Sequence, residues 1–508
     1  MSAAGGGTSA SATVSERLVR QAATWSGING LLYTDGKLQY TPAPVTLTPT
    51  PYPWSEFEYT QRVQPLFNTL VDKVARDREF LLSCLEEVAT SDPFVRRLLD
   101  IFTALPEEHV RNGVNLGILR SDYMLNDEAP GGNVDSGVLQ IEINTIASSF
   151  GCLSKKVGNL HRHLLVRNAN TGDLESLLRT ANIPDALIED QSSLLYSLPE
   201  NDSTETIAKA LALAHVLYKK DPDSIIVFVV QPNERNQADQ RLLEDEIWKK
   251  NGIRVEFLTL EQLGKSARLD ATTGDKILKV QVGQEESPVS VVYYRAGYTP
   301  DDYLTEDHWR VRQLVEQSSA IKCPNVAYQL AGTKKVQQVL FQAGVVERFL
   351  PASDAPLVRK CFAAQYALGS DATPEGLKAV QDATQDGSQW VLKPQREGGG
   401  NNYYGAELSA FLRENKGSSV LSSYVLMQRI FPKAQKAAFL RSGQVQVLDS
   451  ISELGVYGTF LGDGGAEPVL NECAGYLLRT KPVGVDEGGV ATGYSVLNSV
   501  VLIDDEDV

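Results

Sequence analysis

The stretch VLKPQREGGGNNYYGAEL, residues 391–408, places Lys393 and Glu397 beside three consecutive glycines and two asparagines. The residues at 389–393, QWVLK, alternate well enough to predict a short strand that ends where this loop begins. Glycines after a strand can adopt positive φ and bring exposed N–H groups close to an anion, most often a phosphate. The lysine would add a positive charge to such a phosphate site. The carboxylate of Glu397 fits there if Mg²⁺ lies between it and the phosphate oxygens.

A flexible hinge is the alternative interpretation of the same glycines, with the neighbouring charges solvated. The loop matches neither G-x-x-x-x-G-K-[ST] nor G-x-G-x-x-G, so the two nucleotide-binding folds that carry those patterns are not supported. The stretch alone leaves both a phosphate loop and a hinge open.

The composition is that of a soluble globular protein, with 42% apolar and 22% charged residues. A chain of 508 residues is too long for one simple core, so we expect two or three packed lobes. A net charge of −16 argues against nucleic acid or an anionic membrane as a partner, and it means that an ATP site must collect its own positive charge. The longest apolar runs, such as IIVFVV at 225–230, are too short to span a bilayer.

The five cysteines are widely spread and form no CxxC or Cys/His cluster, which argues against zinc and a disulfide framework and suits a reducing compartment. Residues 1–12 contain only Met, Ser, Ala, Gly and Thr, so we expect a disordered tail and no secretory signal. We therefore expect a cytoplasmic protein. An organellar transit peptide is the alternative, because this end is poor in acids and Arg17 and Arg20 follow it.

The periodicity of the chain changes along its length. Helical spacing over 56–104 and 203–220 is followed by a predicted strand at 223–231, a helix that ends at Gly252 and another strand at 253–259. This β-α-β order predicts a parallel three-layer unit, which closes near 289–295. The segment 352–388 is predicted to be mostly helix or loop, and from 389 onward the predicted strands are mainly antiparallel.

The segment LQIEINTIASSFG at 139–151 holds candidate cation ligands. If its first six residues form a strand, Glu142 and Asn144 share one face, and Ile141 and Ile143 lie on the other. A carboxylate and an amide oxygen on one face are good ligands for a hard cation. A solvated strand face would have the same pattern, so both interpretations stay open.

Polar residues also follow predicted strands elsewhere. Glu234, Asn236 and Gln240 come after the carboxyl end of a strand, where open α/β units bind ligands, although a helix N-cap would explain the asparagine equally well. Arg120 follows an apolar run and could hold a substrate carboxylate, or form an ordinary surface salt bridge.

Further cations stand in comparable places. Arg295 and Tyr298 follow another strand, Arg479 and Lys481 share a strand face before a glycine-rich loop, and Lys334 follows a glycine. Together these stretches supply oxygens for Mg²⁺, cations for phosphates and arginines for carboxylates. No nucleophile lies near a histidine in them, so acyl-enzyme chemistry is weakly supported.

Eight motifs in this order resemble the eukaryotic-type glutathione synthetases, a family of ATP-grasp ligases, and they cover the chain from about residue 40. They are RSDYM (120–124), QIEINTIASSFG (140–151), ERNQADQR (234–241), RAGY (295–298), QLAGTKKVQQ (329–338), VLKPQREGGGNNYYG (391–405), ISELG (451–455) and LLRTK (477–481) with the glycine-rich loop after it.

The resemblance implies an α/β fold with α+β elements: an ATP-grasp body of antiparallel sheets flanked by helices, a three-layer parallel α/β substrate subdomain and a glycine-rich lid. It implies a homodimer that uses ATP and Mg²⁺ to join γ-glutamylcysteine to glycine through an acyl phosphate. The corresponding division of the chain is a tail at 1–12, a helical part of the body with the metal-ligand strand at 13–222, the substrate subdomain at 223–332, and the rest of the body at 333–508, with the lid at about 352–437.

The resemblance also assigns roles to positions. The magnesium ligands are Glu142, Asn144 and Glu397. ATP is held by Lys334, Lys393, Gly398, Gly399, Gly400, Tyr404, Met427, Ile430, Glu453, Lys481 and Glu487. The γ-glutamylcysteine site is Arg120, Ser149, Glu234, Asn236, Gln240, Arg295 and Tyr298, and the acceptor end is Arg479, Val490 and Ala491. The catalytic positions are Arg120, Lys393 and Arg479.

Three positions depart from the family pattern. Ala296 stands where an acid is frequent, Glu487 replaces an aspartate, and Thr492 follows Ala491 where many members have a second alanine. Relatives that use β-alanine differ in this last loop, so a homoglutathione synthetase is one alternative. A non-catalytic ATP-binding protein on the same fold is the other, although the metal ligands and phosphate lysines speak against a degenerate site.

Overall fold

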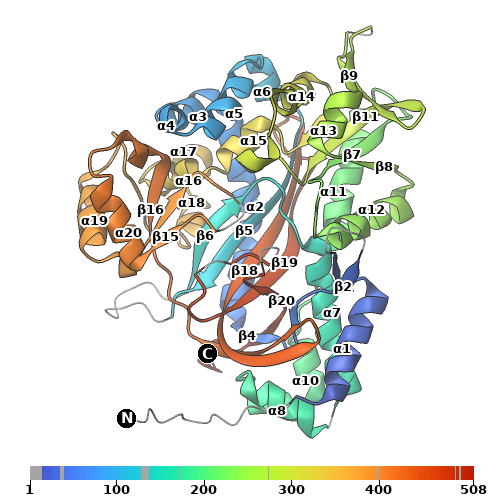
Figure 1. The fold of residues 1–508 in the computed structure, drawn as a ribbon, viewed down its shortest axis with the longest axis vertical. Coiled ribbons are helices and arrows are strands. Elements are labelled where there is room, and N and C mark those ends of the chain that lie inside the picture. Colours follow the sequence, from blue (N-terminus) through green and yellow to red (C-terminus); the bar gives the residue numbers. More distant parts are fainter. Residues whose placement is uncertain are drawn as a thin grey trace, which may run out of the picture.

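The computed structural model describes residues 14–34, 39–127, 137–169, 171–272, 274–397, 400–486, 488–490 and 493–507. Seven described strands form a sheet through the middle of the molecule (Figure 1). It combines strands from the first 150 residues with strands from the last 80, and all neighbours are antiparallel except β3 and β20. Its order is β17 (Gln435–Arg441), β3 (Val45–Thr46), β20 (Val496–Asn498), β19 (Leu470–Pro482), β18 (Gln444–Gly462), β5 (Asn115–Leu125) and β6 (Val138–Asn144).

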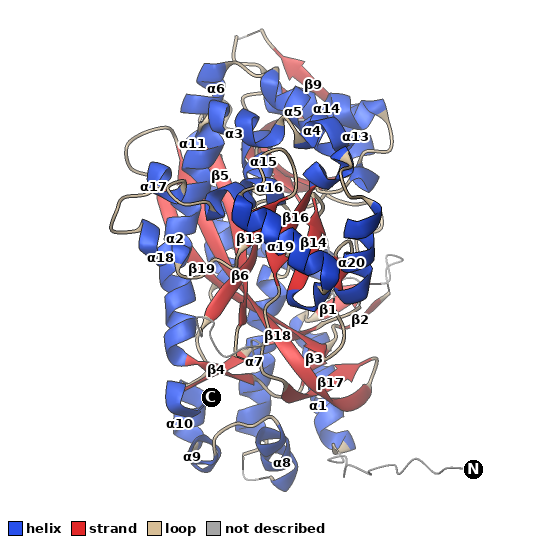
Figure 2. Ribbon diagram, turned by 90° about the vertical axis from the view of Figure 1, so that its left-hand side faces the viewer, coloured by secondary structure: helices blue, strands red, loops and turns tan. Residues whose placement is uncertain are grey.

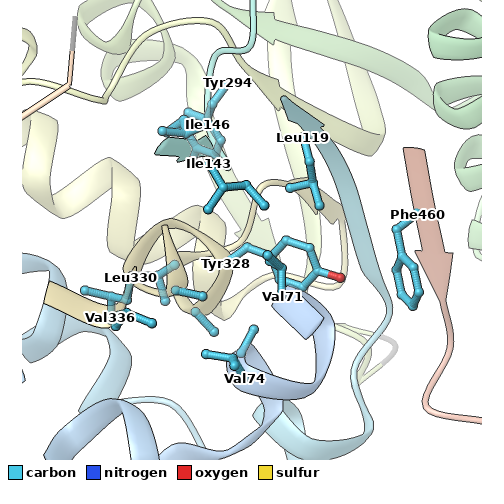
Figure 3. Close-up of a cluster of buried hydrophobic side chains, with 14 of the residues drawn as sticks. Val71, Val74, Leu119, Ile143, Ile146, Tyr294, Tyr328, Leu330, Val336 and Phe460 are labelled. Atoms are coloured by element: carbon cyan, nitrogen blue, oxygen red, sulfur yellow. The ribbon is translucent and has the colours of Figure 1, made fainter. Parts of the chain in front are cut away.

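One face of this sheet is apolar and packs on helices. Because side chains alternate along a strand, Leu119 on β5 and Val456 on β18 face the same core as Val71 and Val74 of α2. Figure 3 shows part of this cluster, including Phe460 of β18. The helices on this side are α2 (Trp54–Arg76), α3 (Arg78–Leu85), α4 (Val88–Ser91), α5 (Pro93–Thr103), α6 (Glu107–Asn112), α15 (Val326–Ala331), α16 (Lys334–Phe341), α17 (Val346–Phe349) and α18 (Ala355–Arg359).

The other face carries the polar residues that the motifs contain. The register pairs Glu453 with Arg479 across β18 and β19, and Arg120 with Asn144 across β5 and β6. Four neighbouring strands therefore present charged and amide groups on the same face, the face opposite to α2.

A second sheet, drawn mainly in green in Figure 1, contains the predicted β-α-β unit. The helix between its first two strands is followed by Gly252 as its C-cap, whose φ of 66° lies in the left-handed region. The parallel pairing is confirmed, while an antiparallel pair, β9 and β10, extends the sheet in a way that the sequence did not predict. The strands are β7 (Ile225–Val229), β8 (Val255–Leu258), β9 (Ala267–Asp270), β10 (Ile277–Val282), β11 (Glu285–Tyr294) and β12 (Ile321–Cys323), with α11 (Ser203–Tyr218), α12 (Gln237–Asn251), α13 (Leu260–Ser266) and α14 (Glu306–Gln317).

A third, antiparallel sheet lies to one side of the central sheet and carries the opening stretch of the sequence analysis (Figure 1). The predicted strand at 389–393 is confirmed as β14 (Trp390–Pro394), and 352–388 contains one short strand, β13, besides helices and loops. In Figure 2 the helices α19 and α20 lie over the outer face of this sheet. Its order is β13 (Gln365–Ala367), β16 (Tyr424–Gln428), β14 and β15 (Tyr403–Tyr404), with α19 (Pro374–Gln385) and α20 (Gly405–Glu414).

The remaining elements belong to different parts of the chain. They are α1 (Glu16–Asn29), β1 (Leu32–Thr34), β2 (Tyr40–Pro42), β4 (Thr50–Pro53), α7 (Gly151–Arg167), α8 (Gly172–Thr180), α9 (Asp185–Glu189), α10 (Gln191–Tyr196), β21 (Val500–Ile503) and four short 3₁₀ segments: Pro300–Asp302, Gly387–Gln389, Ser419–Ser423 and Asp505–Asp507. The five cysteines all lie in the described ranges and are free thiols. Among the helices described above, none combines the length and the apolar character needed to cross a bilayer.

Candidate active site

A cavity of about 440 Å³ lies where the polar face of the central sheet meets the third sheet. Its walls come from β5, β6, β18 and β19 on one side and from β14, β16 and the following loops on the other. Fifteen of the predicted site residues line it: Arg120, Glu142, Asn144, Ser149, Tyr298, Lys334, Lys393, Glu397, Tyr404, Met427, Ile430, Glu453, Arg479, Lys481 and Val490.

The three predicted metal ligands lie together in this cavity. Glu142 and Asn144 are presented by β6, and Glu397 by the loop after β14. The Nζ of Lys334, at the start of α16, is 2.9 Å from Oε2 of Glu142 and 2.8 Å from Oε1 of Glu397. Burial would raise the pKa of Glu142, but the charges of Lys334 and Lys393 hold it below its ordinary value. Burial and the Glu142 charge together raise the pKa of Glu397 despite the lysine.

The predicted alternation along this strand is wrong at one residue. Ile143 packs in the core as expected, but Ile141 also lines the cavity beside Glu142. The cause is a β-bulge, because the pairing of β5 with β6 shifts register between Asp122 and Tyr123. A single sequence carries no signal for such a shift in this strand.

Three buried lysines supply positive charge to the cavity. The Nζ of Lys393 donates to the carbonyl of Ile141 at 2.8 Å, and burial lowers the pKa of Lys393 to about 8. The Nζ of Lys481 lies 3.1 Å from Oε1 of Glu453 and donates to a backbone carbonyl at 2.7 Å. With Lys334, these groups place three ammonium positions around one space in a protein that is acidic as a whole.

Two of the three predicted substrate arginines, Arg120 and Arg479, meet at a carboxylate that the motif analysis did not single out. Asp122 accepts from Nε of Arg120 at 2.6 Å and from Nη2 of Arg479 at 2.8 Å. Burial alone would lower the pKa of Arg120, but the Asp122 charge raises it above its ordinary value. The spacing contained a signal, since Asp122 stands two residues after Arg120 and therefore on the same strand face.

The loop after β6 forms another wall. Ala147 and Phe150 have φ of 52° and 75°, in the left-handed region that side chains other than glycine rarely adopt. The carbonyl of Ser149 accepts from the hydroxyl of Tyr457 at 2.5 Å and from Nη1 of Arg120 at 3.4 Å. The central sheet therefore holds this strained loop against the cavity.

Within the described part of the chain, four predicted substrate residues are not among those lining the cavity: Glu234, Asn236, Gln240 and Arg295. They form a buried group behind the loop just described. Glu234 accepts from Nε2 of Gln240 at 2.9 Å, and neither polar atom of the Asn236 side chain has a hydrogen-bond partner in the described residues. Arg295 pairs with Asp239 at 3.1 Å, and Asp239 also accepts from the backbone N–H of Phe150 at the start of α7.

Some predicted positions lie outside the described residues, and others were missed. Gly398, Gly399, Glu487 and Ala491 fall in the undescribed segments, as does Thr492. Gly400 is described and has a φ of 81°, but it is not among the described cavity-lining residues. Lining residues that sequence reasoning did not assign include Arg396, Asn401, Asn402, Arg429, Ile451 and Asp486.

The family model for the ATP-binding domain of eukaryotic glutathione synthase matches residues 12–502. The chain belongs to the eukaryotic glutathione synthetases. It is therefore an ATP-dependent ligase that makes glutathione, and the predicted family and reaction are confirmed.

Several glutathione synthetases match almost the whole chain. The chloroplastic glutathione synthetase of Arabidopsis thaliana is 39% identical over 500 residues, which cover 96% of this chain and 85% of the relative. The enzyme of Dictyostelium discoideum is 35% identical, and the alignment covers 96% of this chain and 98% of the relative. The enzyme of Homo sapiens is 38% identical, and the alignment covers 90% of this chain and 89% of the relative.

A solved structure supports the fold. The apo form of a glutathione synthetase-like effector from Globodera pallida superposes with a TM-score of 0.72, at 20% identity, over 96% of each chain. The predicted combination of antiparallel sheets, flanking helices and a parallel α/β part is confirmed at the level of fold class.

Proposed function

We propose that this cavity is where glutathione synthesis takes place, with ATP, Mg²⁺, γ-glutamylcysteine and glycine meeting between the central sheet and the lid. The observation that carries the proposal is that one cavity contains three oxygen-bearing side chains suited to a cation, three buried lysines and two arginines, Arg120 and Arg479. The oxygen-bearing side chains would bind the metal, the lysines the phosphates and the arginines the substrate carboxylates.

The residues present fit Mg²⁺. Two carboxylates and one amide oxygen are hard donors of the kind that this ion prefers, and Lys334 already joins both carboxylates. Glu142, Asn144 and Glu397 would hold the ion. When bound, it would neutralise charge on the phosphate oxygens of ATP.

The lysines and an apolar strip would hold ATP. Lys334, Lys393 and Lys481 surround the space that the triphosphate needs, and Met427 and Ile430 belong to a small apolar cluster on the lid side. An apolar slot beside a cluster of ammonium groups matches the two ends of a nucleoside triphosphate. The adenine would therefore lie toward β16 and the phosphates toward β6.

γ-Glutamylcysteine would extend from Arg120 and Ser149 toward the buried group behind the loop. Asn236 supports this direction, because its amide is 3% exposed and both of its polar atoms lack partners among the described residues. A buried amide without hydrogen-bond partners lowers the stability of the fold unless a polar ligand supplies those partners. The α-amino and α-carboxyl groups of a γ-glutamyl moiety could do so.

The chemistry needs no protein nucleophile. The cysteinyl carboxylate of the substrate attacks the γ-phosphorus of ATP, ADP leaves, and an acyl phosphate forms. The glycine amine then attacks the acyl carbon, phosphate leaves, and the amine proton is lost as the amide forms. Arg479, whose Nε has no partner among the described residues, would stabilise the charge that develops on the acyl phosphate.

An acceptor assay tests the proposed reaction. With ATP, Mg²⁺ and γ-glutamylcysteine, glycine should exceed β-alanine about 10- to 200-fold in kcat/KM, because an added methylene costs a close-fitting site about 1–3 kcal/mol. A preference for β-alanine would indicate homoglutathione synthesis with the ligase chemistry intact. ATP binding without phosphate release in the presence of both substrates would indicate a non-catalytic protein.

We also propose a homodimer. Val216 on α11 and Trp248 on α12 are 61% and 59% exposed, and these two helices pack against each other. Exposed apolar side chains grouped in this way are typical of a protein–protein contact. Light scattering after size exclusion should give twice the mass of the chain, and Trp248→Glu should lower it.

We propose lobes at 13–222, 223–332 and 333–508, with the lid at about 352–437, because separate sheets form in the last two. We propose a cytoplasmic location, which the free thiols suit, although plant relatives are named chloroplastic. A fluorescent fusion of residues 1–40 should stay diffuse in the cytoplasm, and import into an organelle would contradict this.

A further inference from the structure

One buried carboxylate joins side chains from three strands of the central sheet. Asp122 on β5 is 0% exposed, and its Oδ2 accepts from Nη2 of Arg120 at 2.9 Å, from Nη2 of Arg479 at 2.8 Å and from Nδ2 of Asn144 at 3.0 Å. Its Oδ1 accepts from Nε of Arg120 at 2.6 Å. The carboxylate therefore contacts one proposed metal ligand, Asn144, and two of the three proposed substrate arginines.

A glycine makes this meeting across strands sterically feasible. Arg479 on β19 reaches Asp122 on β5 over the intervening strand β18, whose residue opposite Asp122 is Gly455. A Cβ at Gly455 would lie 2.8 Å from Cδ of Arg120 and 2.8 Å from Oδ1 of Asp122. Only a residue without a side chain leaves room for the cluster.

The same carboxylate fixes which way the Asn144 amide points. Its Nδ2 donates to Oδ2 of Asp122 at 3.0 Å and to the carbonyl of Arg120 at 3.3 Å. Both partners are acceptors only, so the NH₂ group must face them. The amide oxygen is thereby directed away from these partners and toward the cavity that Asn144 lines.

We infer, on the basis of the proposed function, that Asp122 is a positioning residue for both halves of the site. It holds the two arginines in place for the substrate carboxylate and the acyl phosphate. It also makes the oxygen of Asn144 the atom that faces the metal. An amide at position 122 could present either a donor or an acceptor, so Asn144 could flip and point its NH₂ group at the cation.

The experiment measures binding of a non-hydrolysable ATP analogue by calorimetry at increasing Mg²⁺, together with kcat and KM. The wild type should bind the analogue in a Mg²⁺-dependent way. Asp122→Asn should raise the Mg²⁺ concentration for half-maximal binding by roughly 10- to 100-fold, the usual effect of losing the group that orients a metal ligand. It should also raise KM for γ-glutamylcysteine.

A swap separates orientation from folding. In Asp122→Asn/Asn144→Asp, the amide at 122 can donate to one carboxylate oxygen at 144 and leave the other for the metal. The Mg²⁺ concentration for half-maximal binding should return to within about threefold of the wild-type value. It should not return fully, because the new contact between positions 122 and 144 orients the ligand less well than the native contact. The KM for γ-glutamylcysteine should stay high, because the arginines still lack their charged partner.

Two further variants guard against a purely structural effect. Glu316→Gln removes an equally buried carboxylate from the Arg312 pair on α14, and it should lower stability without changing the Mg²⁺ requirement. Gly455→Ala leaves every charge in place but crowds the cluster, and it should raise the Mg²⁺ requirement. If Asp122→Asn does not fold, the Mg²⁺ requirement of Gly455→Ala tests the positioning role of Asp122 in its place.

The possible results have distinct meanings. An unchanged Mg²⁺ requirement in folded Asp122→Asn, an absence of recovery in the swap, or an unchanged requirement in Gly455→Ala would each overturn the inference. If the wild type itself binds the analogue independently of Mg²⁺, the proposed metal site fails, and the inference about Asp122 fails with it.

Discussion

Lys334 contacts two carboxylates that we propose as magnesium ligands. Its Nζ lies within 2.9 Å of Glu142 and 2.8 Å of Glu397, in a setting where all three side chains are largely shielded from water. The lysine offsets the repulsion between the two acids, which would otherwise disfavour two ionised carboxylates in one small space. The glutamate after β14 is therefore part of an ion cluster, not a solvated lid residue.

The first prediction tests the metal role of Glu397. Glu397→Gln keeps the shape of the side chain but removes its charge, and kcat should fall by about two orders of magnitude or more, because charge neutralisation of the triphosphate is the main catalytic term. The unfolding midpoint without ligand should change little, since Lys334 keeps Glu142 as a partner. Glu407→Gln on the exposed side of α20 is the control and should retain activity. Near wild-type turnover of Glu397→Gln at saturating Mg²⁺ would refute the assignment.

At the scale of elements, Asp92, the N-cap residue of α5, connects the loop after β14 to this helix. Asp92 caps this helix, since its Oδ1 accepts from the N–H groups of Phe94 and Val95 at 3.0 Å each. Its Oδ2 forms an ion pair with Arg396 from the loop after β14. One carboxylate thus serves both a helix terminus and the attachment of the lid.

The second prediction separates these two uses of Asp92. Asp92→Asn keeps the cap, because asparagine caps about as well as aspartate, but it loses the ion pair. The KM for ATP should rise roughly fivefold, corresponding to about 1 kcal/mol for a partly exposed pair, with little loss of stability. Asp92→Ala should show the same KM and should lose about 1 kcal/mol more in the free energy of unfolding. If the two variants are equally unstable and ATP affinity is unchanged, Arg396 does not hold the lid.

The third prediction concerns pH and helix α7. His161 is fully buried, with Nδ1 2.7 Å from Oγ of Ser499 and Nε2 2.9 Å from the carbonyl of Thr46, and burial lowers its pKa to about 4. In the unfolded chain the histidine has its ordinary pKa of about 6.5, so between pH 6.5 and pH 4 the unfolded state binds more protons than the folded state. The free energy of unfolding should therefore fall as the pH is lowered from about 6.5 to 4, by up to ~3 kcal/mol.

Denaturant midpoints of wild type and His161→Gln, followed over this pH range, check the effect. His161→Gln should be less stable than the wild type at pH 7, but its stability should fall less as the pH is lowered. Other groups that titrate in this range are common to both proteins and cancel in the difference. His163→Gln on the same helix, where the ring is only partly buried, is the control. Parallel curves for wild type and His161→Gln would show that this histidine does not set the acid sensitivity.

Local elements could be predicted from the sequence where one pattern decided them. The strand at 225–229, the helix that ends at Gly252 and the strand before the glycine loop all have strong local signals, and all three are present. The bulge that turns Ile141 into the cavity has none, because it depends on how β6 pairs with β5. Register between strands is set by tertiary packing and not by either strand alone.

At the scale of the whole molecule, the site depends on contacts between distant parts of the chain. Asp122 and Arg479 are 357 residues apart and meet only because a single strand, β18, separates β19 from β5 and has a glycine opposite Asp122. The spacing places Asp122 on the same strand face as Arg120, so that proximity could be predicted. Its contact with Arg479 could not be predicted, because it appears only when the strands are assembled.

The last prediction follows from the position of the cavity between two sheets. A ligand that contacts β6, β18 and β19 as well as β14 and β16 stabilises the assembled state by mass action. ATP and Mg²⁺ at about 100 times the dissociation constant should add about 2.7 kcal/mol. For 508 residues this is roughly 2 to 3 °C in the unfolding midpoint, because the entropy of unfolding is about 2 cal/mol/K per residue. EDTA should abolish most of the gain, since the triphosphate then meets the two carboxylates without a cation between them. Mg²⁺ alone and EDTA alone are the controls, and an equal rise with ATP in the presence of EDTA would show that nucleotide binding does not require the metal.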